Sequence, residues 1–357
     1  MAQRPRRHRN PLKARYHRPG TAPGTYDVAA TRESVDAGVA ILEYDRQALR
    51  RYHSLEAFTP RRGTVRWIRV GSHPPLALLE ALKSRYAIDP MALEDVVVQS
   101  HRPKFSTFDG GCLLSLAIPR GGAGETAPLN LYLSDNTLVT FFDDASLFGP
   151  IEQRLASGSR LRGASAHDLA YALLDLAVDL LFPLYEQTSE RLERLEEELL
   201  DRPGESFLRE AHAVRRELLV LRRTTWATRE VVGDLLRHWD SPPLRHLRPL
   251  LQDSYEHVVT IVDLVETQRE IATSLVEIYL SLASNRLNDV MRVLTIIATL
   301  FIPPTFVAGI YGMNFRTDAG PWSMPELEWP YGYLLVLGIM GVMITAMLVY
   351  FRRKRWL

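Results

Sequence analysis

The chain has 357 residues, enough for a soluble domain of about 200 residues with further elements attached. Its 43 lysines and arginines balance 42 acidic residues, so no net charge draws it to nucleic acid, and we expect no nucleic-acid partner. Cys112 is the only cysteine, which excludes a disulfide within one chain and fits a reducing compartment.

Residues 1–25 are expected to form a disordered basic arm. The first 20 residues contain seven lysines and arginines, three prolines and no acidic residue. The arm has no apolar core segment, so we do not interpret it as a signal peptide. Contact with anionic lipid and a simple solvated tail both stay open as its role.

Residues 26–243 are predicted to form a cytosolic α/β and helical domain. Apolar and alternating patterns predict five strands, at 39–42, 65–70, 113–118, 129–133 and 137–142. An amphipathic helix is predicted at 75–87, and the glycine-rich residues 119–128 predict a hairpin loop. We therefore expect a mixed sheet between helices.

After Ser165 the pattern is helical. Residues 166–201 are interrupted only by Pro183, and a second helix is predicted over 205–240. The third helix, 244–310, contains no glycine or proline between Pro249 and Pro303 and measures roughly 100 Å if it is continuous. A helix of this length exceeds the globular norm, so we expect residues 244–292 to form a stalk that leads into a membrane.

Two uncharged runs predict a transmembrane domain at 293–357. Val293–Ile310 and Tyr331–Phe351 each have the length needed to cross about 30 Å of hydrocarbon. A buried core helix explains either run alone, but it explains the pair poorly. Arg352–Arg355 follow the second run and predict a cytosolic C-terminus, hence a cytosolic N-terminal domain and a multi-pass protein of the cell (inner) membrane. Only the loop 311–330 then faces outward.

One face of the third helix carries a seam of mostly small or polar residues at alternating steps of four and three. The seam consists of Glu277, Ser281, Ser284, Asn288, Met291, Thr295, Ala298, Ile302, Thr305 and Gly309. A 3.5-residue repeat of this kind faces a symmetry axis, and its polarity predicts a water-filled path built by several copies. Close packing of small residues in a helix bundle is the alternative. Because two spans cannot enclose a pore, conduction requires an oligomer.

The loop between the two runs begins with Tyr311-Gly312-Met313-Asn314. Gly312 permits a tight turn, and Asn314 offers a neutral amide oxygen to a passing cation. A loop between two spans lies at one mouth of any pore that the spans build.

Several separated motifs resemble the CorA magnesium/cobalt channels of the 2-TM-GxN metal ion channel superfamily. The motifs are Tyr311–Phe315 with its Gly-Met-Asn (GMN) signature, Met324–Trp329, Asn288–Thr299, Pro90–Val96 and His101–Lys104. They occur in the family's order, and the likeness spans nearly the whole chain after residue 30. Two departures stand out. Eight residues, 316–323, lie where typical members have about two, and Ile88 replaces a second acid beside Asp89.

The resemblance implies a homopentameric, funnel-shaped channel in which the stalk helix becomes the pore-lining span. It implies a selectivity filter of Gly312, Met313 and Asn314, and it adds Leu294 to pore-lining positions that match Asn288, Met291, Ile302 and Thr305. Regulatory metal would bind between protomers at Asp89, Asp175 and Asp253. The implied ion is Mg²⁺, both transported and regulatory, with Co²⁺ or Ni²⁺ also passing.

Three alternatives remain to be weighed. A zinc transporter of the same superfamily is disfavoured because the pore offers oxygen rather than Cys or His ligands. A non-conducting, membrane-anchored metal sensor or scaffold does not explain the polar seam. An enzyme is the weakest alternative, because the sequence has no Walker loop, no nucleophile elbow and no close His/Glu metal pair.

Overall fold

The computed structural model describes residues 24, 38–98, 102–120, 125–201, 203–204, 206–313, 324 and 329–356. The chain divides into two compact units, residues 1–275 and 276–357. This division falls inside the predicted stalk, 244–292, and the predicted bounds of the arm, stalk and transmembrane domain stay predictions. The basic arm lies outside the described residues apart from Gly24.

The first unit is built around a seven-stranded mixed sheet in the order β2-β1-β3-β7-β6-β5-β4. Only the β3–β7 pair is parallel, and the other five pairs are antiparallel. The strands are β1 Ala40–Tyr44, β2 Leu49–Tyr52, β3 Val65–Val70, β4 Lys104–Phe108, β5 Gly111–Arg120, β6 Glu125–Ser134 and β7 Thr137–Phe141.

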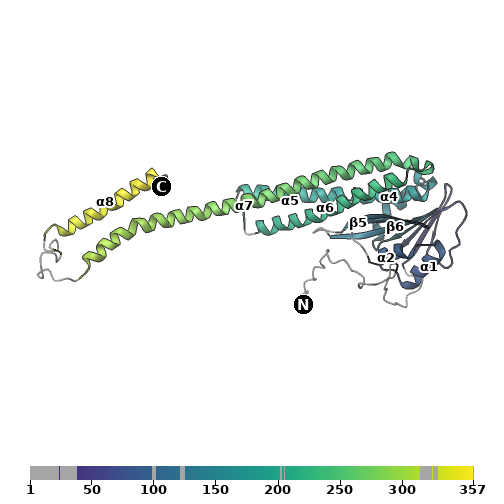
Figure 1. Ribbon diagram of the computed structural model, residues 1–357, viewed down its shortest axis with the longest axis horizontal. Helices are drawn as coiled ribbons and strands as arrows, with labels where there is room; N and C mark the ends of the chain where they lie inside the picture. The colour runs from purple at the N-terminus through teal and green to yellow at the C-terminus, as the bar shows by residue number, and fades with distance from the viewer. Residues whose placement is uncertain are drawn as a thin grey trace. The chain divides into compact units, whose positions relative to one another are not determined.

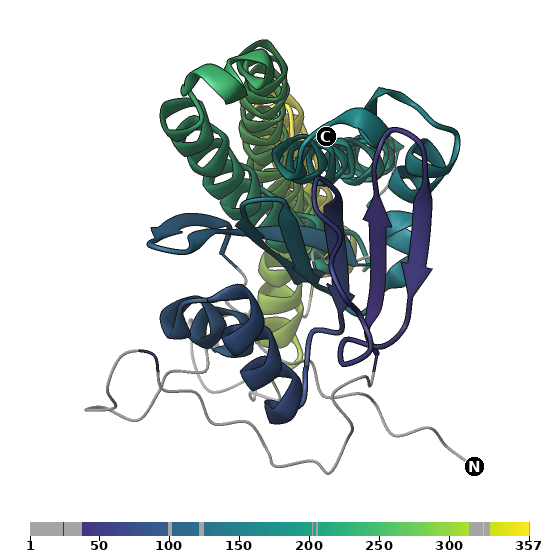
Figure 2. The same ribbon diagram turned by 90° about the vertical axis from the view of Figure 1, so that its right-hand side faces the viewer.

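Helices cover both faces of this sheet, as Figure 2 shows with α1 and α2 on one side and the α4–α6 group on the other. The helices of the first unit are α1 Leu76–Tyr86, α2 Pro90–Val98, α3 Gly149–Ala156, α4 Ala166–Asp179, α5 Leu181–Asp201 and α6 Phe207–His238. Short 3₁₀ helices, η1 Ala145–Phe148, η2 Arg160–Gly163 and η3 Pro242–Leu247, join them. Helix α7, Arg248–Tyr311, starts directly after η3.

Each sheet face carries its own hydrophobic core. Along β5, Leu113 packs into the cluster under α1 and α2, whereas Leu114 packs into the cluster under α4. Both side chains are fully buried. Because β5 is covered on both faces, its sequence is a continuous apolar run rather than an alternation of apolar and polar residues. Gly111 opens this strand, and a Cβ there would lie 2.2 Å from the Leu133 carbonyl oxygen, so only glycine allows the close approach to β6.

The structure confirms the five predicted strands as β1, β3, β5, β6 and β7, and the predicted helix 75–87 as α1. The hairpin predicted at 119–128 is present, since β5 and β6 pair antiparallel, but its loop is shorter than predicted, because β5 continues to Arg120 and β6 starts at Glu125. The prolines and glycines of this segment were interpreted as loop residues. The pairing of β5 with β6 in fact continues until Arg120 lies opposite Glu125. Strands β2 and β4 were not predicted, since neither is buried on both faces.

The predicted helical stretch 166–201 is two helices, α4 and α5, with the break at Leu180. Pro183 does not cause the break; it lies in the first turn of α5, where a missing N–H costs no helical hydrogen bond. The predicted helix 205–240 is α6, and the third helix begins at Arg248 after the 3₁₀ turn of η3.

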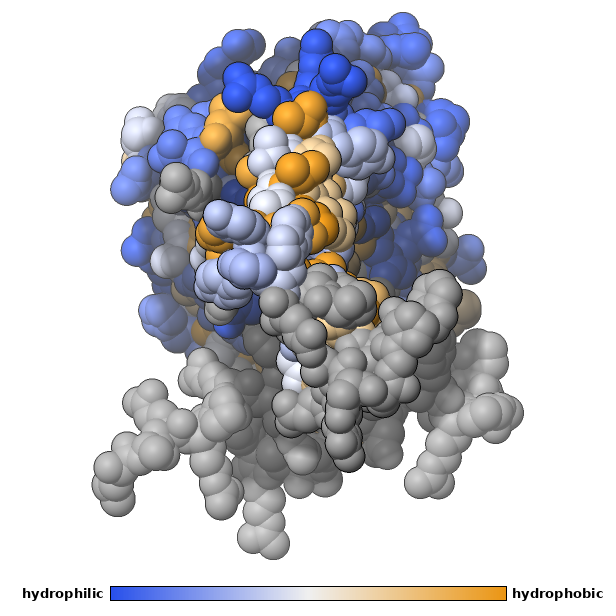
Figure 3. All heavy atoms as spheres, turned by 90° about the vertical axis from the view of Figure 1, so that its left-hand side faces the viewer, coloured by the Kyte–Doolittle hydropathy of each residue, from blue (hydrophilic) through white to orange (hydrophobic). Residues whose placement is uncertain are grey.

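The second unit contains the rest of α7 and helix α8, Gly332–Arg353. Both helices have a segment long and apolar enough to cross a membrane, and only 6% and 11% of those segments are buried. A core helix of a soluble protein is mostly buried, so this exposure favours membrane spans for both. Figure 3 shows hydrophobic residues gathered over the helices at this end of the chain.

Helix α7 stays helical through Pro303 and Pro304 up to Tyr311. Figure 1 shows α7 curving toward its C-terminal end, as expected where two prolines remove backbone donors from the helix. The prediction that a membrane helix would tolerate this pair agrees with the continuous helix.

Candidate functional site

The predicted pore face lies on α7 within the second unit. Its described side chains are largely uncovered by the rest of the chain. Exposure is 57% for Met291, 57% for Leu294 and 65% for Ile302. Residues off the seam are equally uncovered, with Leu287 at 67% and Val290 at 64% exposed. Ile296 is buried at 9% exposed, so the chain covers α7 only locally, as expected if lipid and further protein chains surround the rest of it.

One polar side chain on this face forms a hydrogen bond within the helix. The Thr295 hydroxyl donates to the Met291 carbonyl oxygen at 2.7 Å, as helical Thr side chains commonly do. This bond leaves the hydroxyl oxygen able to accept from water. Among the residues that the structure describes, no heavy atom lies within 4 Å of the position of an added Cβ at Gly309, so no described contact requires glycine there. Asn288 and Thr305 also lie on α7 and are exposed, whereas Ala298 is half-buried.

The mouth of this face begins where α7 ends. The Gly312 N–H donates to the Ala308 carbonyl oxygen at 2.9 Å, and the Met313 N–H donates to Ile310 at 3.1 Å. A Cβ on Gly312 would lie 3.1 Å from the Ala308 oxygen, so a larger residue would press on the helix end. Met313 is 49% exposed. The third predicted filter residue, Asn314, lies outside the described residues.

Two of the three predicted regulatory aspartates lie on neighbouring helices of the first unit. Asp175 in α4 accepts a hydrogen bond from the Ser254 hydroxyl at 3.1 Å and one from the Tyr171 hydroxyl at 3.2 Å. Ser254 directly follows Asp253 in α7, so the two carboxylates belong to one helix–helix contact. The Asp253 side chain is 65% exposed, and its Oδ1 lies 4.0 Å from His257 Nε2.

Several carboxylates lie close together near this helix–helix contact, and their proximity changes the pKa values of neighbouring groups. Partial burial raises the pKa of Asp179, the nearby Asp175 carboxylate raises it further, and His257 opposes the shift. Burial also raises the pKa of the Tyr171 phenol to about 12, so that hydroxyl stays a hydrogen-bond donor. Sequence reasoning missed Tyr171 and Ser254, although their spacing from the two aspartates, four residues and one residue, was a usable signal.

Asp89 lies on the other side of the sheet. It precedes α2, and its Oδ1 accepts from the Met91 N–H at 2.7 Å while its carbonyl oxygen accepts from the Leu93 N–H. Its neighbour Ile88 is only 2% exposed and belongs to the core under α1 and α2, so it offers no ligand. The chain therefore places Asp175 and Asp253 on neighbouring helices, joined by the Ser254–Asp175 hydrogen bond, and leaves Asp89 on the other side of the sheet.

Within the described ranges, no three acidic, cysteine or histidine side chains gather closely enough to hold a metal ion. A site that uses Asp89 with Asp253 consequently needs ligands from two chains. Carboxylate oxygens are suited to Mg²⁺, which prefers hard oxygen ligands and keeps several of its waters.

Comparison with known proteins identifies the family of this chain. Residues 62–353 match the family described as CorA-like Mg²⁺ transporter protein. The chain is also 35% identical over 350 residues to a protein of Thermotoga maritima named cobalt/magnesium transport protein CorA, covering 95% of this chain and 97% of that one. The chain belongs to the CorA family of transporters. This confirms the resemblance drawn from the GMN and stalk motifs, and it confirms that the protein is a transporter rather than an enzyme.

Other CorA relatives agree. The protein of Methanocaldococcus jannaschii named cobalt/magnesium transport protein CorA is 27% identical over 235 residues, which covers 65% of this chain and 72% of that one. Among solved structures, the complete CorA magnesium transporter of the same organism matches with a TM-score of 0.76 at 23% identity, over 90% of this chain and 99% of that one. This match confirms the predicted fold, a mixed-sheet domain with a long helix and two membrane-capable helices. The ZntB cytoplasmic domain of Vibrio parahaemolyticus matches less well, with a TM-score of 0.55 at 15% identity, over 70% of this chain and 99% of that one.

Proposed function

We propose that the protein is a homopentameric channel that conducts Mg²⁺, and also Co²⁺ or Ni²⁺, into the cytosol across the cell membrane. The observation that carries this proposal is the long helix α7. Its seam of mostly small or neutral polar residues is exposed from Asn288 to Gly309 except at the half-buried Ala298, and it leads to Gly312 and Met313. The names of relatives that cover nearly the whole chain support the choice of ion.

Neutral oxygens suit this ion. Mg²⁺ holds its water shell tightly and demands octahedral geometry at about 2.1 Å. A ring of five Asn314 amide oxygens can hydrogen-bond to that shell without stripping it, and so selects by hydrated size. Carboxylates in the same place would bind the ion too strongly for rapid exit. Met291 and Leu294 form an apolar constriction that conducts only when wetted.

The membrane potential supplies the driving force. A potential of 100 mV contributes about 2.3 kcal/mol per charge, hence about 4.6 kcal/mol for a divalent cation. Influx therefore needs no nucleotide hydrolysis. The basic tail Arg352–Arg355 favours a cytosolic position for both termini.

Gating is proposed to rest on Asp89, Asp175 and Asp253. Because Asp89 lies on the opposite sheet face from the Asp175–Asp253 contact, we place the bridging ion between one protomer's Asp89 and the Asp253 of a neighbouring protomer. Empty sites leave like charges facing each other, and bound Mg²⁺ neutralises them. High cytosolic Mg²⁺ then biases the pentamer toward its closed state.

Mg²⁺ uptake into proteoliposomes tests the pore assignment with matched substitutions on α7. Asn314→Ala and Thr305→Ile are expected to reduce uptake at least about tenfold, because one removes the filter amide and the other narrows and dries the seam. Thr299→Ile makes the same change off the seam and should leave uptake within about twofold. Pentamer assembly, measured by native mass, should be retained in all three variants. Equal loss at Thr299 and Thr305, or full uptake by Asn314→Ala, would remove the pore assignment.

A further inference from the structure

A hollow on the first unit shares no residue with the predicted metal positions. It has a volume of about 350 Å³, at the lower end of the range of small-molecule sites. Three segments form it: the turn between β1 and β2, the loop before β3, and the junction of η2 with α4. We call it the arginine pocket and define it by Tyr44, Asp45, Arg46, Gly63, Arg162 and Gly163.

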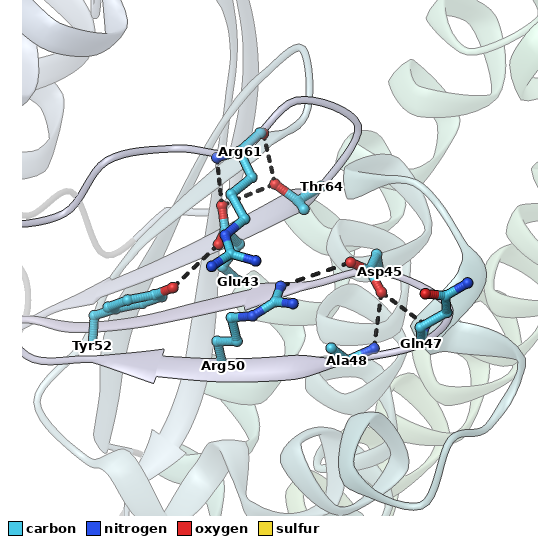
Figure 4. A network of polar contacts seen from close by, with 8 residues as sticks. All are labelled: Glu43, Asp45, Gln47, Ala48, Arg50, Tyr52, Arg61 and Thr64. Carbon is cyan, nitrogen blue, oxygen red and sulfur yellow. Dashed lines mark hydrogen bonds and ion pairs between the residues drawn. The ribbon is translucent and has the colours of Figure 1, made fainter.

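The arginine pocket carries donors that the chain does not use. Arg162 is partly buried, and its Nε atom has no hydrogen-bond partner among the described residues. Arg46 lies across Gly163, with its Nε 3.2 Å from the position of an added Cβ, so glycine makes room for this guanidinium. Arg50 stands beside the same turn, where Figure 4 shows it reaching toward Asp45. Its Nη1 lies 3.8 Å from Asp45 Oδ2, too far for a hydrogen bond.

Tyr44 adds a buried donor. Its side chain is fully buried, and its hydroxyl has no hydrogen-bond partner in the part of the chain that the structure describes. Burial and the nearby Asp168 carboxylate raise the pKa of this phenol, so the hydroxyl keeps its proton at neutral pH. An unsatisfied buried hydroxyl costs free energy, and a ligand that accepts a hydrogen bond recovers that cost.

The two carboxylates of the region are already occupied. Asp45 Oδ1 accepts from the Gln47 and Ala48 N–H groups at 2.7 and 2.8 Å, as drawn in Figure 4. Asp168 accepts from the Ser165 N–H at 2.9 Å and from His246 Nε2 at 2.8 Å. Asp45 Oδ1 and both oxygens of Asp168 are therefore taken by the chain's own donors, while Arg46, Arg162 and the Tyr44 phenol, which line the pocket, keep unused donors. The excess is of donors and of positive charge.

We propose that the arginine pocket binds a phosphate group, either as inorganic phosphate or as a phosphate monoester on a small soluble molecule. Guanidinium groups match phosphate oxygens in charge and in hydrogen-bond geometry, and a tyrosine hydroxyl supplies a further neutral donor. This site is separate from the proposed ion conduction. Its ligand would be an anion that binds the first unit, whereas the proposed transported ion is a cation that passes along α7.

The test is binding to the full-length protein in lipid nanodiscs, without Mg²⁺ and at low salt, measured by calorimetry. The probes are inorganic phosphate, AMP and adenosine. Phosphate and AMP are expected to bind and adenosine is not; AMP binding more tightly than phosphate would identify a monoester as the ligand, and equal binding would identify inorganic phosphate. Failure of both anions to bind at roughly 10 mM, or equal binding of adenosine and AMP, overturns the proposal.

Substitutions locate the site. Arg162→Gln and Arg46→Gln are each expected to weaken binding about tenfold, because each removes a charge-assisted hydrogen bond. Tyr44→Phe, which keeps the packing of the ring, should weaken it about threefold. Arg160→Gln is the matched control, since Arg160 lies on the same 3₁₀ helix, is exposed and does not line the pocket. Because Arg46 is exposed, its substitution does not endanger folding. An equal loss in Arg160→Gln would show that only net charge matters and would overturn the assignment.

Discussion

Cys112 is the only thiol of the chain, and the fold decides its chemistry. It lies in β5 with 9% of its surface exposed, inside the core between the sheet and α4. Burial raises the pKa of the thiol to about 12, which removes nearly all thiolate at neutral pH. Burial in this apolar core therefore makes Cys112 an inert thiol.

Alkylation by iodoacetamide at pH 8 tests this. Because the thiolate is the reactive form, native Cys112 is expected to react roughly a thousandfold more slowly than a free cysteine. Complete labelling should follow once the protein is unfolded in urea, which serves as the internal control. Rapid labelling of the native protein would show that the strand opens or that the core is looser than described.

The residues that the sequence could not connect are those joined only by the fold. Asp175 and Asp253 are 78 positions apart in sequence. The local spacing of Tyr171 and Ser254 marks these two residues as neighbours of the aspartates, but only the fold shows that their helices are in contact. Asp89 carries a local signal, since it precedes Pro90 at a helix start, but that signal indicates a helix cap as much as a ligand. The metal roles of all three came from the family resemblance and remain proposals.

Helix α4 shows how one element is anchored at its start. Ser165 and Asp168 form a capping box, and His246 from η3 donates to the same carboxylate. Burial alone would raise the pKa of Asp168, but the hydrogen bonds from Ser165 and His246 outweigh it and hold the pKa below its usual value. The Asp168 carboxylate thereby links the start of α4 to η3.

The stability of the fold should therefore depend on this carboxylate. Asp168 is a stronger acid when folded than when unfolded, so its contribution is fully present above about pH 4 and is lost as the pH falls through the folded pKa. Asp168→Asn is expected to lower the free energy of unfolding by about 1 kcal/mol at pH 7. It should also make the loss of stability between pH 5 and 3 shallower than in the wild type. Asp240→Asn is the control, since Asp240 is exposed and pairs only with Arg248. Identical acid profiles for wild type and Asp168→Asn would contradict the account.

Strong hydrophobic patterns in the sequence predicted helices and strands well, and weak patterns did not. The apolar strands β3, β5, β6 and β7 and the long helices α6 and α7 follow from their own residues. Edge strands β2 and β4 could not be predicted in this way, because each is paired on one side only and is incompletely buried. The hairpin of β5 and β6 was shortened in the prediction, because Pro119 and Pro128 were taken as loop residues although both are paired.

At the scale of the whole molecule, the two membrane-capable helices of one chain cannot enclose a pore, so the proposed channel depends on several copies. The face of α7 is consistent with this need, since most of its seam is exposed in the single chain, although Ala298 is half-buried and Ile296 beside it is buried. The seam was predicted from the 3.5-residue repeat alone. The assembly that would cover it rests on the proposed pentamer.

Gating by cytosolic Mg²⁺ belongs to the same scale. Wild-type influx is expected to fall at least about tenfold when Mg²⁺ on the cytosolic side rises to millimolar levels, because the bound ion favours the closed state. The double variant Asp89→Ala with Asp253→Ala should stay open there. Asp263→Ala removes an exposed charge from the same long helix and should gate normally. A double variant that still closes would refute the role of these carboxylates.

Ion-resolved influx into proteoliposomes at an imposed potential of about 100 mV, negative inside, tests the central claim most directly. The account predicts Mg²⁺ influx that grows with the potential, is shared by Co²⁺ or Ni²⁺, and exceeds Zn²⁺ influx, because the pore offers neutral oxygens rather than nitrogen or sulfur ligands. Zn²⁺ influx above that of Mg²⁺ would make the protein a zinc transporter. No potential-driven influx of any divalent cation would contradict the channel altogether and favour a membrane-anchored metal sensor.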